Sequence, residues 1–132
     1  MKSLHESAFF RVEELPVKQG LEGIQLRSVD LKNLMMTFVE YPAGSKVPQH
    51  FHPCEQITYV LEGMLEVTLE HDSHVLGPGE GVRIPPNTQH SSRPVDGPAK
   101  ALDAWTPIPQ HFKVEPLATL GHHVPIEGES LS

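Results

Sequence analysis

Four side chains that suit a metal ion are closely spaced near the middle of the sequence. His50 and His52 are separated by one residue, Gln56 follows four positions later, and His90 comes after a rigid turn. Alternate residues of a strand lie on one face, so His50, His52 and Gln56 can point into the same interior. Three imidazole nitrogens and one amide oxygen leave room for water or substrate on a six-coordinate metal. The spacing therefore predicts a site for one divalent metal ion.

The elements that must position these residues are short strands. Thirteen prolines and ten glycines divide the chain. Between them lie short apolar or alternating runs at residues 34–41, 56–61, 64–69, 81–84 and 99–105. Runs of this length between frequent turns predict an all-β sandwich or barrel. Residues 1–20 could add one strand and a helical turn, and Gly63 between two runs predicts a tight hairpin with a positive φ.

Composition limits the size class and the partners of the protein. The 132 residues fit one domain, and we predict a barrel over residues 1–115 followed by a C-terminal extension over 116–132. The net charge of −7 disfavours nucleic acid and anionic membrane surfaces as partners. The single cysteine excludes an intrachain disulfide and is typical of a reducing compartment. With no apolar run of about 20 residues and no signal-peptide pattern, we predict a cytoplasmic protein that binds a small molecule.

Two spaced motifs resemble those of the cupin superfamily, over residues 41–105 of the chain. The first family motif is G-x5-H-x-H-x3,4-E-x6-G, and the second is G-x5-P-x-G-x2-H-x3-N. The first is matched here by Gly44, His50, His52, Gln56 and Gly63, and the second by Gly79, Pro85, Asn87 and His90, with Pro94 in the last position.

The resemblance implies the cupin fold, an all-β double-stranded β-helix or jelly-roll barrel. It also implies one divalent transition metal, with Fe, Mn, Ni and Zn as candidates, held by His50, His52, Gln56 and His90. Cupins of this kind commonly form homodimers that exchange N-terminal strands, and residues 4–30 could supply such an element.

Gln56 stands where the family motif usually has glutamate. A neutral amide leaves a metal with three imidazoles its full +2 charge, which makes the metal more electrophilic and its binding weaker. Glu55 stays open as the fourth ligand, because a bulge at Pro53 would shift the parity of the strand. Cys54 could be a soft ligand, a reactive thiol or a buried small apolar residue.

Residues 50–63 and 84–90 also resemble small bacterial cupins of pectin degradation, which linearise 4,5-unsaturated uronates to keto sugars. This resemblance implies a proton-transfer role for Asp103, an aspartate on the last barrel strand. The arginine that follows this aspartate six residues later in the family is Pro109 here, so a natural clamp for a uronate carboxylate is missing. Asp103 could equally be a structural hydrogen-bond acceptor.

Together these features predict a metal-dependent enzyme acting on a small polar molecule, one that bears a carbonyl or carboxylate or derives from a sugar, by isomerase- or lyase-like chemistry. A non-catalytic small-molecule-binding protein and an iron-dependent dioxygenase are the alternatives. Four large side chains could form the pocket wall, although core packing explains each equally well: Met36, Phe38, Tyr41 and Trp105. The histidines at 71, 74, 111, 122 and 123 fit no ligand spacing, and we expect them to be solvated.

Overall fold

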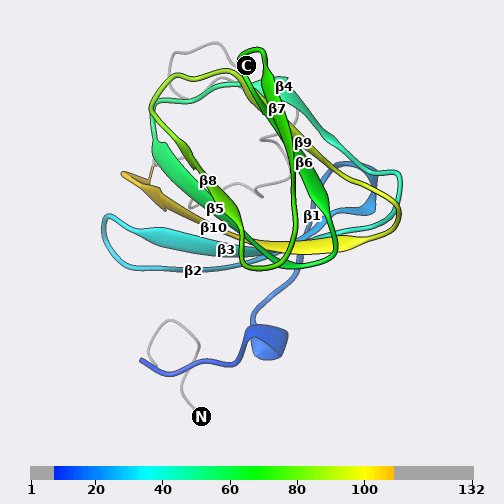
Figure 1. Ribbon diagram of the computed structural model, residues 1–132. Helices are drawn as coiled ribbons and strands as arrows, with labels where there is room; N and C mark the ends of the chain where they lie inside the picture. Colours follow the sequence, from blue (N-terminus) through cyan, green and yellow to red (C-terminus); the bar gives the residue numbers. More distant parts are fainter. Residues whose placement is uncertain (1–7, 109–132) are drawn as a thin grey trace.

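The chain folds into two sheets of antiparallel strands (Figure 1), as seen in a computed structural model that describes residues 8–108. One sheet has six strands in the order β1-β2-β3-β10-β5-β8, and the other has four in the order β4-β9-β6-β7. The strands are β1 (Lys18–Gln19), β2 (Gln25–Asp30), β3 (Met35–Tyr41), β4 (Val47–His50), β5 (Glu55–Glu62), β6 (Leu65–Leu69), β7 (Asp72–Leu76), β8 (Gly81–Ile84), β9 (His90–Pro94) and β10 (Ala99–Thr106). Two short 3-10 helices, η1 (Val12–Glu14) and η2 (Leu21–Gly23), flank β1. The arrangement is a jelly roll, so the predicted all-β fold is confirmed.

The five runs predicted from the sequence form β3, β5, β6, β8 and β10. The other strands have sequences that do not signal a half-buried strand. β7 is exposed over nearly its whole length at the edge of its sheet, and β4 contains Pro48. Proline is tolerated in an edge strand because its missing N–H leaves no ladder hydrogen bond unmade. β9, with the sequence HSSRP, is also polar and contains a proline, although it lies between β4 and β6. Polar or proline-bearing strands are therefore the part of this barrel that apolar periodicity does not reveal.

The inner face of the six-stranded sheet changes from polar to apolar along the barrel. The strand registers place Thr58, Asp103 and Thr37 side by side across β5, β10 and β3. The next inward-facing row in the same three strands is apolar: Val60, Ala101 and Val39. The polar row lies toward the start of β5 and the end of β10, so this end of the barrel is the one that can hold a polar site.

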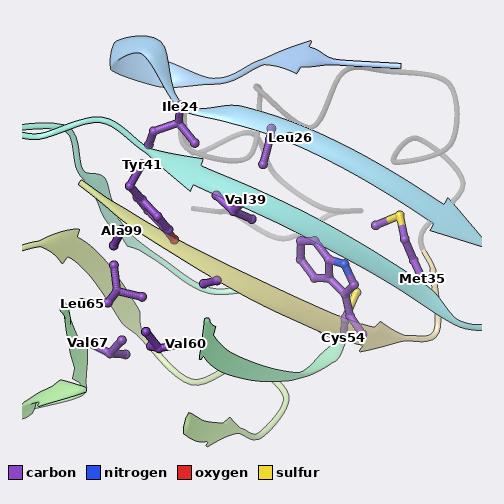
Figure 2. Packing of buried hydrophobic residues seen from close by; sticks show 12 residues of the cluster. Ile24, Leu26, Met35, Val39, Tyr41, Cys54, Val60, Leu65, Val67 and Ala99 are labelled. Atoms are coloured by element: carbon purple, nitrogen blue, oxygen red, sulfur yellow. The ribbon is translucent and has the colours of Figure 1, made fainter. Parts of the chain in front are cut away.

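The other end of the barrel is filled by a hydrophobic core. Figure 2 shows Val39 and Tyr41 of β3 across the barrel from Leu65 and Val67 of β6. Each of these side chains is buried, and Leu65 is completely inaccessible to solvent. Burying an aliphatic side chain of this size contributes about 1.5–3 kcal/mol. The core thus holds the two sheets together, and the polar end of the barrel can carry a functional site.

Strict alternation along β3 corrects one expectation about the pocket wall. The odd-numbered residues of this strand are buried, whereas Met36 and Phe38 between them are only partly buried. Successive side chains of a strand point to opposite faces, so Met36 and Phe38 lie on the outer face of the six-stranded sheet. The expectation that these two residues line the interior was wrong. Because both faces of this strand are largely apolar, its sequence could not tell inside from outside.

Gly63 connects the two sheets and does not close a hairpin within one of them. β5 pairs with β10 and β8, whereas β6 pairs with β7 and β9, so the predicted hairpin is wrong. The predicted positive φ is present, at 78°. A Cβ at this position would collide with the carbonyl oxygen of Pro98 and the backbone of Ala99. The chain can pass between the sheets here because glycine allows both the dihedral and the close approach.

We expect Gly63→Ala to lower the free energy of unfolding by about 3 kcal/mol, because the clash adds to the cost of a left-handed alanine. Gly79→Ala is the matched control. Gly79 has a φ of 89°, but a Cβ there meets nothing within 4 Å, so its replacement should cost only about 1 kcal/mol. Chemical denaturation of both variants measures the difference. Equal losses would show that the close approach at Gly63 is unimportant.

The predicted C-terminal extension, residues 116–132, lies outside the described residues, so the boundary at residue 115 stays a prediction. Within residues 8–108 there is no helix with the length and apolar character needed to cross a membrane. The cytoplasmic location also stays a prediction.

Candidate metal centre

Three histidines from different segments meet at the polar end of the barrel. His50 ends β4 and is paired in register with His90, which begins β9. His52 lies just beyond β4, in the bend that leads to β5, so it does not share a strand with His50 as the sequence suggested. One candidate ligand atom from each of the three lies within 4.8 Å of the others, and all three residues are buried. The ring centroids of His50 and His90 are 4.2 Å apart.

The second motif also holds the first one in place. Asn87, in the turn before β9, donates its backbone N–H to the carbonyl oxygen of His52 at 2.7 Å. Asn87 has a φ of 60°, a left-handed conformation that asparagine tolerates better than most residues. The turn that precedes His90 therefore also fixes the backbone of His52, which locks two ligand candidates from different segments into one geometry.

Each of the three imidazoles is oriented by a backbone carbonyl two residues away in the sequence. The acceptors are Pro48 O for His50 at 2.9 Å, Cys54 O for His52 at 3.2 Å and Thr88 O for His90 at 2.8 Å, in every case with the ring Nδ1. A carbonyl oxygen can only accept, so each Nδ1 carries a proton as the donor. In the neutral ring, Nε2 then keeps its lone pair, which is the atom a metal ion requires.

Gln56 brings an oxygen to the same point. It is buried on β5, while Glu55 before it is exposed on the other face of the strand. The Oε1 atom of Gln56 lies 3.0 Å from Nε2 of His52, and its Nε2 donates to Thr58 Oγ1 at 2.9 Å. The structure therefore turns Gln56 toward the histidines and Glu55 away from them.

The arrangement leaves two features that a cation would resolve. The Nε2 atom of His90 is buried without a hydrogen-bond partner among the described residues. The Nε2 atom of His52 and the Oε1 atom of Gln56 both present lone pairs to each other across 3.0 Å. Buried polar atoms without partners are costly. Three imidazole nitrogens and an amide oxygen in this geometry fit a divalent transition metal.

Protonation of His52 and His90 is unfavourable, so a proton does not readily take the place of the metal ion. Burial lowers the pKa of His90 to about 3, with a smaller contribution from the neighbouring His50. Burial also lowers the pKa of His52. Hydrogen bonds with Gln56 and Cys54 act in the opposite direction and are outweighed by burial. Both rings therefore stay neutral around pH 7, and neutral imidazole is the form that binds metals.

Asp103 lies behind the histidines on β10. It is buried, and it accepts a hydrogen bond from Thr58 Oγ1 at 2.7 Å. Burial raises the pKa of Asp103 to about 6, although hydrogen bonds from Thr58 and Gln56 oppose the shift. A carboxyl group with a pKa near neutrality can exchange a proton at working pH. Its links to the site run through Gln56 and Thr58, two residues that stand two apart on one face of β5.

Trp105 and Tyr41 both belong to the hydrophobic cluster, and Trp105 also lies next to His52. The ring centroids of Trp105 and His52 are 5.5 Å apart, and the indole N–H donates to Thr37 Oγ1 at 3.4 Å. Tyr41 is buried in the hydrophobic cluster and shares a 3.1 Å hydrogen bond with Ser92. Of the four side chains considered for a pocket wall, only Trp105 stands beside the candidate ligands.

The single cysteine and the other histidine residues considered from the sequence are not part of this site within the described residues. Cys54 is buried in the hydrophobic cluster and is outside the group of metal-ligand candidates within residues 8–108. His71 and His74 are exposed, as expected. The histidines at 111, 122 and 123, like Pro109, lie outside the described residues.

Sequence reasoning missed Thr58 and the three carbonyl acceptors. Thr58 carried a signal, because it follows Gln56 by two residues and so had to share its inward face. The carbonyls carried none, because every residue has one and only the local bend decides where it points.

The sequence family described as "Cupin domain" matches residues 37–105, slightly more than half of the chain. The chain belongs to the cupin family. This match includes Gln56, His50, His52 and His90 and the strands that carry Thr58 and Asp103. The resemblance inferred from the two motifs is thereby confirmed.

Several known cupins are similar to this one. It is 40% identical over 73 residues to the dimethylsulfoniopropionate lyase DddQ of Ruegeria pomeroyi, which covers 54% of this chain and 36% of the lyase. It is 26% identical over 101 residues to the pectin degradation protein KdgF of Dickeya dadantii, which covers 75% of this chain and 92% of that protein. The solved structure of KdgF from Halomonas sp. superposes with a TM-score of 0.72 at 29% identity, covering 77% of this chain and 94% of that one.

These similarities cover different fractions of the related proteins. The chain spans between 36% and 49% of the length of three curated relatives, the lyase among them. It spans nearly the whole of both KdgF proteins. The likeness to the pectin degradation protein KdgF therefore extends over nearly the whole length of that protein.

We expect the protein purified without added metal to contain about one divalent ion per chain, because one ring nitrogen from each of three histidines lies within 4.8 Å of the others. The double variant His50→Ala, His90→Ala should lose about nine-tenths of this metal or more, since a single imidazole remains. His74→Ala, an exposed histidine on β7, is the control and should keep it. Elemental analysis of the three proteins makes the comparison, and equal metal content in all of them would contradict the site.

Proposed function

We propose that this cupin is a metal-dependent enzyme that acts on a small polar molecule bearing a carbonyl or carboxylate, by isomerase- or lyase-like chemistry. The observation that carries the proposal is that one ring nitrogen each from His50, His52 and His90 lies within 4.8 Å of the others, while every Nδ1 is held by a backbone carbonyl. A purely structural cluster would satisfy such buried nitrogens with donors from the protein. Here the Nδ1 atoms are satisfied and the Nε2 of His90 is not.

In this proposal the three histidines and Gln56 bind the metal ion. A divalent metal bound there would polarise an oxygen of the substrate and favour loss of a neighbouring proton. His50, His52 and His90 would hold it as neutral ligands, and Gln56 would add an uncharged oxygen. Because none of these ligands is anionic, the full positive charge stays available to the substrate.

Asp103 is the proposed proton carrier. Its pKa of about 6 lies close to neutrality, where a carboxylate can take up a proton and return it. Trp105 stands beside His52 and would exclude water from one side of the site. Asp103 thus supplies the acid–base function that the metal ligands, whose Nδ1 protons are tied to carbonyls, cannot supply.

The relatives support small carboxylate-bearing or sugar-derived substrates. One is named as a lyase of dimethylsulfoniopropionate and another as the pectin degradation protein KdgF, and the solved structure of a KdgF is also similar. The position at which the pectin-degradation cupins resembled by this chain have an arginine is occupied by Pro109. The proposal therefore takes the reaction type from these relatives and leaves the uronate as one member of a class of substrates.

A substrate panel tests the function. We expect metal-loaded protein to convert at least one of a set of 4,5-unsaturated uronates, dimethylsulfoniopropionate and related carboxylates, followed by NMR. Asp103→Asn should lower kcat about 10²-fold or more, since it removes a general acid–base. Asp72→Asn, at an exposed position on β7, should leave kcat unchanged.

The outcomes separate the function classes. Binding of panel members without turnover would favour a non-catalytic binding protein, and turnover that requires dioxygen would favour an iron-dependent dioxygenase. Either result would contradict the proposal, as would equal activity of Asp103→Asn and the unsubstituted protein.

The proposed partner is a second copy of the chain. On the outer face of the six-stranded sheet, the registers align two apolar rows: Tyr59, Leu102 and Phe38 in one, and Ile57, Ala104 and Met36 in the other. Ile57 is 54% exposed and Tyr59 is 44% exposed. A segment with exposed Phe9 and Phe10 precedes β1, and Figure 1 shows it standing away from the barrel. An apolar face, together with a neighbouring segment that exposes Phe9 and Phe10, suits strand exchange between two copies.

We expect the protein to sediment as a dimer at micromolar concentration and Ile57→Asp to sediment as a monomer, because the new charge would be buried at the interface. Val75→Asp, an exposed apolar position on the other sheet, is the control and should remain dimeric. Sedimentation velocity distinguishes the species. A monomeric unsubstituted protein would contradict the proposed dimer.

A further inference from the structure

Three buried polar side chains form a connected group that begins at the candidate ligand Gln56 and continues through Thr58 to Asp103. Gln56 Nε2 donates to Thr58 Oγ1 at 2.9 Å, and Thr58 Oγ1 donates to Asp103 Oδ1 at 2.7 Å. All three residues are at most 9% exposed. β5 carries Gln56 and Thr58 on one face, and Asp103 is paired with Thr58 across β10.

The direction of these hydrogen bonds follows from the chemistry of the groups. An ionised carboxylate can only accept, so Asp103 takes the single hydroxyl proton of Thr58. With its proton committed, the Thr58 oxygen can only accept, and the group that donates to it must be the NH2 end of the Gln56 amide. The oxygen end of that amide then faces His52, where Oε1 lies 3.0 Å from Nε2.

We propose that Thr58, together with Asp103, is a positioning residue that decides which end of the Gln56 amide faces the metal. The two ends of an amide are nearly equal in size, so shape alone does not choose between them. Only the oxygen end has a lone pair for a cation, and the NH2 end would present positive charge to it. The inference rests on the proposed metal site and adds to it a reason for Thr58.

A positioning residue is needed because the ligand at position 56 is glutamine. A glutamate, which most cupin motifs have at this position according to the resemblance described above, presents an oxygen whichever way it turns. The amide of Gln56 could instead present its NH2 end to the metal. Its oxygen would then face the Thr58 oxygen, which is also an acceptor, so this orientation is penalised. A glutamine ligand therefore benefits from fixed acceptors behind its NH2 group. Thr58 supplies one at 2.9 Å, and Asp103, which also accepts from Gln56, supplies another.

A merely structural role for Thr58 makes a different prediction. If the hydroxyl only satisfied the buried carboxylate of Asp103, its loss would lower stability in the same way whatever residue stood at position 56. If it orients the amide, its loss should matter for metal binding when the ligand is glutamine and much less when the ligand is glutamate. The two roles are therefore separated by measuring Thr58 variants in both backgrounds.

The experiment titrates cobalt(II) into the metal-free full chain against a competing chelator and records the visible spectrum of the bound ion. Thr58→Val, which keeps the branched shape without the hydroxyl, should weaken cobalt binding about tenfold or more and change the spectrum. Thr58→Ser, which restores the hydroxyl, should bind within about threefold of the unsubstituted protein. In a Gln56→Glu background, Thr58→Val should weaken binding less than about threefold.

Each other result is decisive. An unchanged affinity and spectrum in Thr58→Val, or an equal loss in the glutamine and glutamate backgrounds, would overturn the positioning role and leave the metal site intact. Failure of the unsubstituted protein to bind cobalt at all would overturn the metal site and the inference with it. Circular dichroism checks that each variant is folded, and Thr58→Ala makes the same comparison should Thr58→Val not fold.

Discussion

The constraint on which this structure depends is the burial of three imidazole rings whose candidate ligand atoms lie within 4.8 Å of one another. Polar atoms are costly to bury unless they have partners. The barrel nevertheless holds His50, His52 and His90 in this arrangement by tying the opposite side of every ring to a carbonyl. A bound cation would give these buried nitrogens a partner. The candidate ligand atoms are already close together in the folded protein without it.

The barrel distributes stability and chemistry between its two ends. β5, β10 and β3 each run through both, with the polar row of Thr58, Asp103 and Thr37 next to an apolar row farther along the barrel. An apolar core that closes one end allows the other to carry groups that are costly to bury. Asp103 shows this cost, since burial raises its pKa to about 6. It stays in place because Thr58 and Gln56 donate to it.

The sequence was sufficient for the fold and for the candidate ligands because both depend on spacing. Five strands were visible as short apolar or alternating runs, and His50, His52, Gln56 and His90 stood at motif distances. It was not sufficient where two parities are equally apolar, as in β3, or where a glycine allows the chain to change sheets, as at Gly63. Strand pairing and inside–outside direction are set by tertiary contacts, which a single sequence does not contain.

The backbone acceptors of the three histidines have a consequence for how this protein can diverge. Pro48, Cys54 and Thr88 contribute a carbonyl and not a side chain to the orientation of the rings. Substitutions at these positions can therefore accumulate without disturbing the imidazoles, provided that the path of the main chain is kept. An alignment of distant homologues would show drift at all three positions beside invariant histidines. Evolution could thus vary the surroundings of the centre, and with them the substrate, while inheriting its geometry unchanged.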